Sequence, residues 1–206
     1  KTSAASMWRS TGDIFDTWES VKDLVKQQEK LHPYNGVGCF NDMDMLIVGM
    51  YGNGNVGLKG CSDVQYKTHF SIWSLLGSPL MIGCDIREMT EETKAILTNP
   101  TLLSIDQDAR CNRPYILKFG GNNDYPIIVR NLENGDVALG FFNLSDSPAN
   151  LWVPSDDLGV PFLQGKRLEG TEAYTGKRIN AVNATLSASL EPHTCEVYRL
   201  KITELP

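Results

Sequence analysis

Residues able to exchange protons gather in three short polar clusters in the first half of the sequence. The clusters occupy residues 8–13, 41–45 and 84–87. Each one follows a short apolar run that favours a strand, and α/β proteins carry their active sites at the carboxyl ends of parallel strands. Arg9, Asp13, Asp42 and Asp44 would meet at such an edge. Carboxylates beside a guanidinium suit general acid–base catalysis on a neutral polar substrate such as a sugar.

A purely structural interpretation of these clusters is the alternative. Aspartate and serine are frequent helix caps, and Asp85 with Arg87 suits a structural ion pair. The equivalent placement of all three clusters after predicted strands favours a shared site over unrelated caps.

Residues 52–57 match the dinucleotide-binding pattern G-x-G-x-x-G. That function needs a helix opening at the third glycine to hold a pyrophosphate, but the chain continues as a predicted loop until Ser62. We therefore interpret the motif as a glycine-rich loop. His32, His69 and His193 lack metal-ligand spacing, and the sequence indicates neither a metal nor another cofactor.

Short apolar runs alternate with helix-like segments up to about residue 110, which predicts a parallel α/β sheet. Asp16 and Thr17 offer N-caps to a first helix that His32-Pro33 would end. The other predicted elements are strands at 7–9, 37–40 and 79–85, the last buried on both sides, and helices at about 62–76 and 90–97.

After about residue 111 the pattern changes to short alternating stretches separated by turns, with no convincing helix. Asn134-Gly135 is a strong hairpin signal. Strands are predicted at 125–130, 137–142, 150–153, 165–168, 184–190 and 194–202. We therefore predict two domains, an α/β domain over residues 1–110 and an antiparallel β-sandwich over residues 111–206.

Composition narrows the possible functions. The 206 residues carry a net charge of −6, so no broad basic face is expected for nucleic acid. The apolar run of residues 45–51 is far shorter than the roughly 20 residues that cross a bilayer, so no membrane contact is expected. Five widely spaced cysteines favour reduced thiols and a cytoplasmic protein, with secretion as the alternative. The length is below the roughly 250 residues of a complete (β/α)8 barrel.

Four motifs resemble, in order and spacing, the α-galactosidases of glycoside hydrolase family 27. They are W-R-S-T-G-D-I at 8–14, N-D-x-D-M-L at 41–46, S-P-L at 78–80 with D-x-R at 85–87, and I-D-Q-D at 105–108. The resemblance implies the last three βα units of a (β/α)8 barrel followed by an antiparallel β-sandwich. Phe40 and Met43 depart from the tryptophan and proline that many members have at these positions.

The resemblance also implies roles for individual residues. Asp13 matches the general acid/base, Arg9 and Asp44 match ligands of sugar hydroxyls, and Met45 matches an apolar contact beside them. Asp42 and the Asp85–Arg87 pair match supporting residues.

The family's nucleophile lies on a barrel strand that this chain does not match, so we expect part of a retaining α-galactosidase that is inactive alone. Its substrate would be a terminal α-galactoside. An α-N-acetylgalactosaminidase or related α-glycosidase, and a non-catalytic carbohydrate-binding fragment, are the alternatives. Three barrel units leave open sheet edges, so we expect the missing N-terminal half, a partner chain or self-association to cover them.

Overall fold

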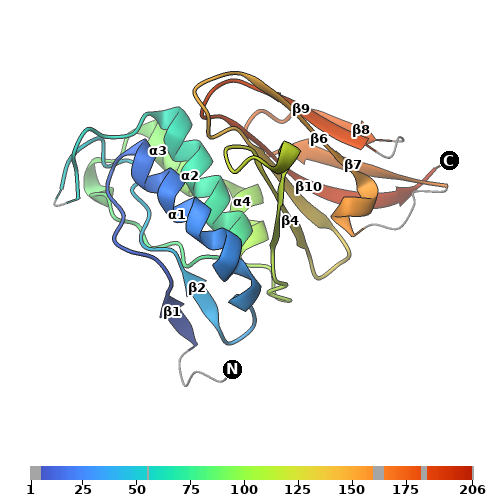
Figure 1. The fold of residues 1–206 in the computed structure, drawn as a ribbon, viewed down its shortest axis with the longest axis horizontal. Coiled ribbons are helices and arrows are strands. Elements are labelled where there is room, and N and C mark those ends of the chain that lie inside the picture. The colour runs from blue at the N-terminus through green and yellow to red at the C-terminus, as the bar shows by residue number, and fades with distance from the viewer. Residues whose placement is uncertain (1–5, 55, 160–164, 182–184, 206) are drawn as a thin grey trace.

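The computed structural model describes residues 6–54, 56–159, 165–181 and 185–205. In its first half, β1 (Met7–Arg9) and β2 (Phe40–Asp42) pair in parallel and are connected through α1 (Trp18–Leu31). Helices α2 (Asp63–Leu76), α3 (Glu91–Leu97) and α4 (Pro100–Asp106) follow. Helices α1 and α2 lie side by side beside these strands (Figure 1). None of the described helices is long and apolar enough to cross a membrane.

The helices begin and end where local chemistry requires it. Thr17 caps α1, and α1 ends just before His32-Pro33, as predicted. Ser62 forms a capping box with Gln65 at the start of α2. Gly77 ends α2 at a φ of 65°, a left-handed conformation that favours glycine. Asp16 was the other predicted cap of α1, but its buried carboxylate instead accepts the backbone N–H groups of Gly52 and Cys61.

The predicted buried strand at 79–85 is wrong. Only an isolated parallel bridge between Leu46 and Ile82 is formed by this segment, and Met81 and Ile82 are half exposed. Leu46 precedes a turn at residues 48–49 rather than lying in a strand, so the ladder does not extend. The strand predicted at 37–40 is shifted, because Gly38 adopts a φ of 69° and places the preceding residues in a turn before Phe40.

The second half is antiparallel. Strands β3, β4, β5, β10, β7 and β8 form one sheet in that order, and β6 pairs with β9 in another. Their bounds are β3 Tyr115–Lys118, β4 Pro126–Asn131, β5 Val137–Phe142, β6 Ala149–Pro154, β7 Lys166–Glu172, β8 Arg178–Ala181, β9 Thr185–Leu190 and β10 Cys195–Glu204. The strand predicted at 165–168 is shorter than β7. Residue 184, where the strand corresponding to β9 was predicted to begin, lies outside the described residues. Strands β3 and β8 were not predicted.

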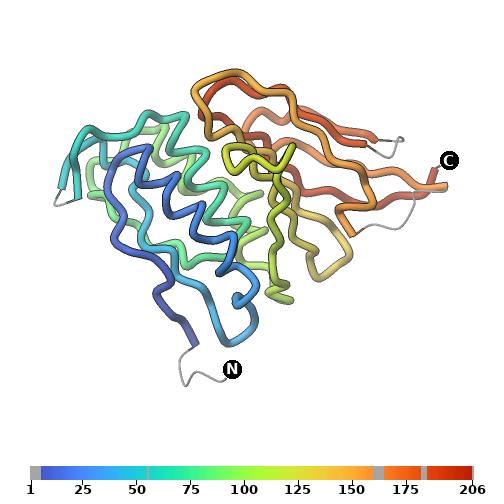
Figure 2. Tube along the Cα trace, viewed as in Figure 1, coloured from blue at the N-terminus to red at the C-terminus, as the bar shows by residue number. Residues whose placement is uncertain are grey.

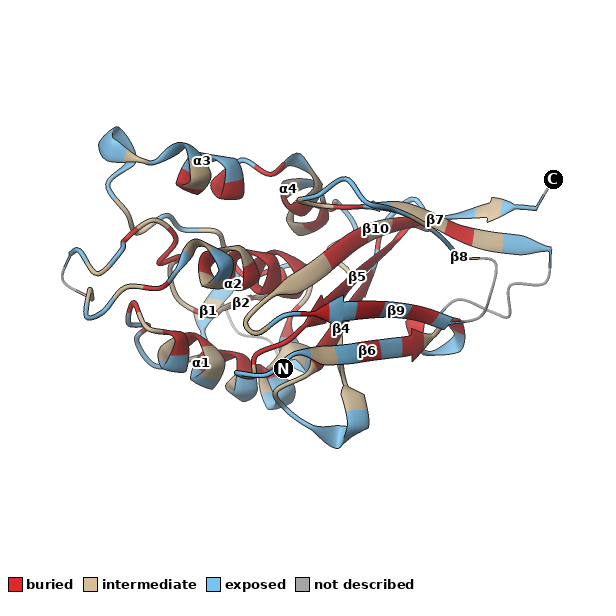
Figure 3. Ribbon diagram, turned by 90° about the horizontal axis from the view of Figure 1, so that it is seen from above, coloured by how far each residue is buried: buried red, intermediate tan, exposed pale blue. Residues whose placement is uncertain are grey.

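Two apolar cores hold the molecule together. One lies between the two sheets of the sandwich and includes Phe141, Leu168 and Leu200. The other joins α1 and α2 to the opposite face of the larger sheet, where Trp73 and Phe142 share one cluster. Figure 3 shows buried residues along α2, β5 and β10, between the two halves. The chain runs from an N-terminus beside β1 to a C-terminus at the far end of the sandwich (Figure 2).

Candidate active site

The predicted polar clusters after β1 and β2 lie together because these strands pair in parallel. Arg9 is opposite Asp42 in the ladder, and the backbone N–H and hydroxyl of Ser10 both donate to the Asp42 carbonyl, at 2.9 and 3.0 Å. The residues that follow each strand therefore emerge at the same edge of the sheet.

Arg9 joins the two clusters. Its Nη2 group donates to Oδ1 of Asp13 at 3.0 Å, to Oδ2 of Asp44 at 2.5 Å and to the Gly12 carbonyl at 3.0 Å. One guanidinium thus lies between two carboxylates that are 31 positions apart in the sequence. Charge-assisted hydrogen bonds of this kind fix orientation as well as adding energy.

The Asp44 carboxylate is held by further donors. Its Oδ2 also accepts from the Ile14 N–H at 2.7 Å, and its Oδ1 accepts from the Met45 N–H at 2.8 Å. With the bond from Arg9, the carboxylate receives three hydrogen bonds out of about four acceptor positions. The side chain is only 16% exposed. Asp44 therefore keeps capacity to accept from one further donor, such as a ligand hydroxyl.

The backbone of Asp44 is constrained as well. Its φ is +85°, which is rare for a residue other than glycine. Asp42 Oδ1 accepts its N–H at 2.9 Å, and the Trp73 indole Nε1–H donates to its carbonyl at 2.8 Å. These two contacts hold a strained conformation at the rim of the sheet, where such strain often accompanies function.

Asp13 differs sharply from Asp44. Its side chain is 84% exposed, and Arg9 is its hydrogen-bond partner among the described residues. A carboxyl with one partner and open access can exchange a proton with a bound molecule, whereas a carboxyl tied by three donors serves better as a fixed acceptor.

Residues 78–83 contact Met45 and the loop after β2. The Met45 sulfur lies against Gly83, where an added Cβ would approach it to 2.9 Å. The buried Ser78 hydroxyl accepts the Met43 N–H at 3.0 Å. The S-P-L motif at 78–80 thus positions the backbone that carries Asp44.

The third predicted cluster does not join the other two. Asp85 and Arg87 form a bidentate ion pair with each other, at 2.9 and 2.5 Å, and hydrogen bonds from Arg87 lower the pKa of Asp85. No hydrogen bond or ion pair in the described part of the chain connects them to Arg9, Asp13 or Asp44.

Two supporting residues were missed by the sequence analysis. They are Trp73 and His69. The His69 ring contacts the Trp73 ring edge-on, with 4.0 Å between the ring centroids, and its Nε2 accepts the Ile47 N–H at 3.2 Å. Burial lowers the pKa of His69 to about 3, so its ring is neutral at pH 7. A buried indole needs a hydrogen-bond acceptor, and that requirement was the available signal for Trp73.

Residues 52–57 lie in a loop rather than at a helix start, as predicted, and residue 55 is outside the described residues. Asp16 closes this loop, because its buried carboxylate accepts from the N–H groups of Gly52 and Cys61 and from the Tyr66 hydroxyl. Within the described ranges, no group of three or more side chains is arranged to hold a metal ion.

The two halves of the chain match two parts of one protein family. Residues 2–108, more than half of the chain, match the family described as alpha galactosidase A. Residues 122–200 match the alpha galactosidase C-terminal beta sandwich domain. The chain belongs to the α-galactosidases of glycoside hydrolase family 27.

Family members of several specificities are similar to this chain. An α-galactosidase of Cyamopsis tetragonoloba is 32% identical over 198 residues, which are 96% of this chain and 45% of that protein. An α-N-acetylgalactosaminidase of Rattus norvegicus is 30% identical over 183 residues, covering 86% of this chain and 41% of that protein. The solved structure of a family 27 β-L-arabinopyranosidase from Geobacillus stearothermophilus superimposes with a TM-score of 0.82 at 25% identity, covering 95% of this chain and 45% of that one.

Membership of the family confirms the fold class as βα units of a partial (β/α)8 barrel followed by an antiparallel β-sandwich. The chain spans less than half the length of these two curated relatives. Met43, where many family members have proline, uses its N–H to bind Ser78, a contact that proline could not make.

Proposed function

We propose that this chain supplies one side of the active site of a retaining α-galactosidase, with Asp13 as the general acid/base. Arg9 and Asp44 would bind hydroxyl groups of the galactose, and Met45 would pack against an apolar face of the ring. The observation that supports this proposal best is the Arg9 guanidinium between the exposed carboxyl of Asp13 and the tightly held carboxylate of Asp44.

The proposed chemistry follows from the difference between the two carboxyl groups. Asp13 protonates the glycosidic oxygen as the leaving group departs, and then takes a proton from the water that attacks the glycosyl–enzyme intermediate. Asp44 accepts a hydrogen bond from a hydroxyl of the sugar at its remaining acceptor position. Arg9 holds both carboxylates at the same edge of the sheet through its hydrogen bonds to them.

A retaining glycosidase needs a second carboxylate about 5–5.5 Å from the acid/base as nucleophile. Asp44 does not suit that task, because its oxygens already accept from Arg9, Ile14 and Met45. We therefore propose that the nucleophile comes from the part of the family fold that this chain does not span, and that the chain alone does not hydrolyse galactosides.

Apolar side chains of the partial barrel are exposed where the rest of the family fold is not spanned by this chain. Met7 on β1, and Met81 and Ile82 on the segment that follows α2, are each about half exposed. We propose that the remaining part of the family fold covers this surface, and that copies of the chain associate through it when that part is absent. A cytoplasmic location stays a prediction from the cysteines, with secretion as its alternative.

An α-N-acetylgalactosaminidase is the second candidate, and the Rattus norvegicus relative favours it. The family resemblance places the residues that select the substituent at the sugar's C2 outside the segments matched here. Relative turnover of aryl α-galactoside and aryl α-N-acetylgalactosaminide by a complete enzyme would separate the two activities.

The acid/base assignment can be tested in a chimera that joins this chain to the part of the Cyamopsis tetragonoloba enzyme that it does not cover. The chimera should hydrolyse an aryl α-galactoside, and the 206-residue chain alone should not. Asp13→Ala should lower kcat by about 10²–10⁴-fold on an α-galactosyl disaccharide and much less on an aryl galactoside with a good leaving group. Azide should partly restore the aryl reaction.

Asp146→Ala is a matched control, because its side chain is 86% exposed and belongs to the sandwich. It should leave both rates within about twofold. Equal losses on both substrates in Asp13→Ala, without azide rescue, would remove the acid/base role. Turnover by the isolated chain at an ordinary glycosidase rate would disprove the proposed incompleteness.

A further inference from the structure

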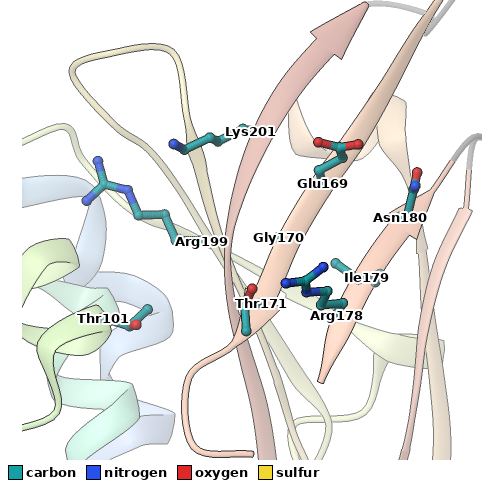
Figure 4. Close-up of a pocket in the computed structure, with 9 residues that line it drawn as sticks. All are labelled: Thr101, Glu169, Gly170, Thr171, Arg178, Ile179, Asn180, Arg199 and Lys201. Atoms are coloured by element: carbon teal, nitrogen blue, oxygen red, sulfur yellow. The ribbon is translucent and has the colours of Figure 1, made fainter. Parts of the chain in front are cut away.

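The outer face of the larger sheet carries a hollow far from Asp13 in the chain. It has a volume of about 470 Å³ and is formed by β7, β8 and β10, with α4 at one side. Figure 4 shows the polar side chains that stand around it on three neighbouring strands. None of these residues takes part in the active site proposed above.

The strand register arranges the lining side chains in two rows. Arg199, Thr171 and Arg178 are paired directly across β10, β7 and β8, and Lys201, Glu169 and Asn180 form the adjacent row. Side chains alternate between the two faces of a sheet, and the intervening Leu168 and Leu200 are buried in the sandwich core. The six polar side chains therefore share the outward face.

Most basic side chains on these strands and in the turn between β7 and β8 are already paired with a carboxylate. Lys166 pairs with Glu204, Arg167 with Glu169, Lys177 with Glu196, and Arg199 with the buried Asp136. The Arg199 guanidinium also donates to Ser104, which fixes it at one side of the hollow.

The side chains of Arg178 and Lys201 have no ion-pair or hydrogen-bond partner among the described residues. They face a hollow whose acidic member, Glu169, is bound to Arg167 at 2.6 Å. Two unneutralised cations in one hollow are notable in a chain with a net charge of −6. Their local charge would attract an anion to this face.

The register also limits the size of that anion. Neighbouring strands are about 5 Å apart and alternate residues of a strand are about 7 Å apart, so the Cα atoms of Arg178 and Lys201 are about 12 Å from each other. In Figure 4 the Lys201 side chain extends away from Arg178, so the two cations suit charged groups that are separated from each other rather than one small anion. The Thr171 hydroxyl lies on β7, between the strands that carry these two cations, and the Asn180 amide lies near Arg178 on β8; both groups donate to and accept from hydroxyls.

We propose that this hollow binds an acidic oligosaccharide, a short sugar chain that carries negatively charged groups on separate rings. Arg178 and Lys201 bind the charged groups, Thr171 binds a hydroxyl of the intervening ring, and Asn180 binds a hydroxyl of the ring near Arg178. This site lies on the sandwich and is independent of the proposed galactosidase activity. It would hold the enzyme on a charged polysaccharide near its substrate.

The 206-residue chain can be titrated calorimetrically at low ionic strength with trigalacturonate, with a sulfated galactotriose and with neutral galactotriose. At least one charged trisaccharide should bind about 10-fold more tightly than the neutral one, since each charged group gains a charge-assisted hydrogen bond. The tighter of the two shows whether the sugar's charged groups are carboxylates or sulfates. The Asp13→Asn variant should bind it unchanged, which separates this site from the proposed catalytic one.

The double variant Arg178→Gln/Lys201→Gln should lose about 10-fold in affinity for that ligand. Lys166→Gln/Lys177→Gln removes the same charge from ion-paired side chains nearby and should lose less than about twofold. Thr171→Val should weaken trisaccharide binding without affecting triglutamate. Equal losses in both double variants, triglutamate binding as tight as the sugar, or no binding of either charged trisaccharide would overturn the proposal.

Discussion

Single residues at the rim of the barrel strands are held by contacts from distant parts of the chain. Asp44 lies in a strained conformation, and Trp73, 29 residues away on α2, binds its carbonyl. The Trp73 side chain is completely buried. Substitution of this tryptophan therefore acts on the stability of the helix and on the geometry of the site together.

We expect Trp73→Phe to lower the free energy of unfolding by about 2–4 kcal/mol, because the Asp44 carbonyl loses its buried donor and a cavity replaces the second ring. Urea unfolding measures this change. Trp152→Phe is the control, because Trp152 is 54% exposed on β6, and it should cost less than about 1 kcal/mol. Similar costs in the two variants would show that the Trp73–Asp44 contact adds little.

Asp106 on α4 predicts an unusual pH dependence. Burial raises its pKa to about 7, while the nearby Arg130 opposes the shift. The unfolded carboxyl titrates near 4, so the folded state binds the additional proton between about pH 4 and pH 7. This group therefore favours folding fully below pH 4, and its contribution is lost as pH rises through 7.

Asp106→Asn removes that titration. The variant and the parent should be similarly stable at pH 4, and the variant should become the more stable by about 1–2 kcal/mol at pH 8, allowing for partial exposure of the site. Urea midpoints measured across this range test the prediction. A constant difference between the two proteins would contradict the raised pKa.

At the scale of elements, helix α2 packs closely against the sandwich sheet. A Cβ added to Gly140 on β5 would lie 2.7 Å from a methyl group of Leu75 on α2 and 2.5 Å from the Phe142 ring. The absence of a side chain at Gly140 thus lets the helix approach the strand.

We expect Gly140→Ala to destabilise the protein by about 1–3 kcal/mol through overpacking. In Gly36→Ala the added methyl group meets nothing within 4 Å, so its cost should be about 0.5 kcal/mol or less. Thermal unfolding of both variants compares the costs, and a Gly140→Ala protein as stable as the control would show that the helix moves freely on the sheet.

Local signals predicted the elements that carry their own caps and periodicity. Helices α1 and α2 are examples, because Thr17 and Ser62 cap long apolar stripes. Helix α4 is only one or two turns long, so its periodicity is too short to detect. The segment at 79–85 has the composition of a buried strand, but composition does not show whether neighbouring strands are available to pair with it.

The site was predictable only in part. Clusters after β1 and β2 could be expected to meet, because parallel pairing brings the ends of strands together. The bond from Trp73 to Asp44 and the bond between Ser78 and Met43 join segments about 30 residues apart. Such contacts depend on tertiary packing, which no local pattern encodes. The roles proposed for Asp13, Arg9, Asp44 and Met45 stay predictions.

At the scale of the whole molecule, the proposed incompleteness has a measurable result. Met81 and Ile82 expose apolar surface next to the short pair of strands β1 and β2. We expect the isolated chain to self-associate as its concentration rises, because burial of this surface is favourable. Sedimentation velocity over a range of concentrations would show the association.

Met81→Glu/Ile82→Glu should shift that association to higher concentrations by about 10-fold. Trp152→Glu, which places a charge at an equally exposed position on the sandwich, should leave it unchanged. A chain that stays monomeric at every concentration, or a shift in the control alone, would show that the barrel surface is not the contact.

The shared core has a consequence for dividing this protein into parts. Ile128 and Phe142 of the sandwich belong to the same apolar cluster as Trp73 of the barrel units, and buried Arg130 on β4 donates to the carbonyls of Ile105 and Asn112. The predicted domain boundary at 110/111 therefore separates two stretches of sequence that share one hydrophobic core. A sandwich excised there would expose its own side of this core to water, so the two domains are not interchangeable modules and must be recombined as one piece.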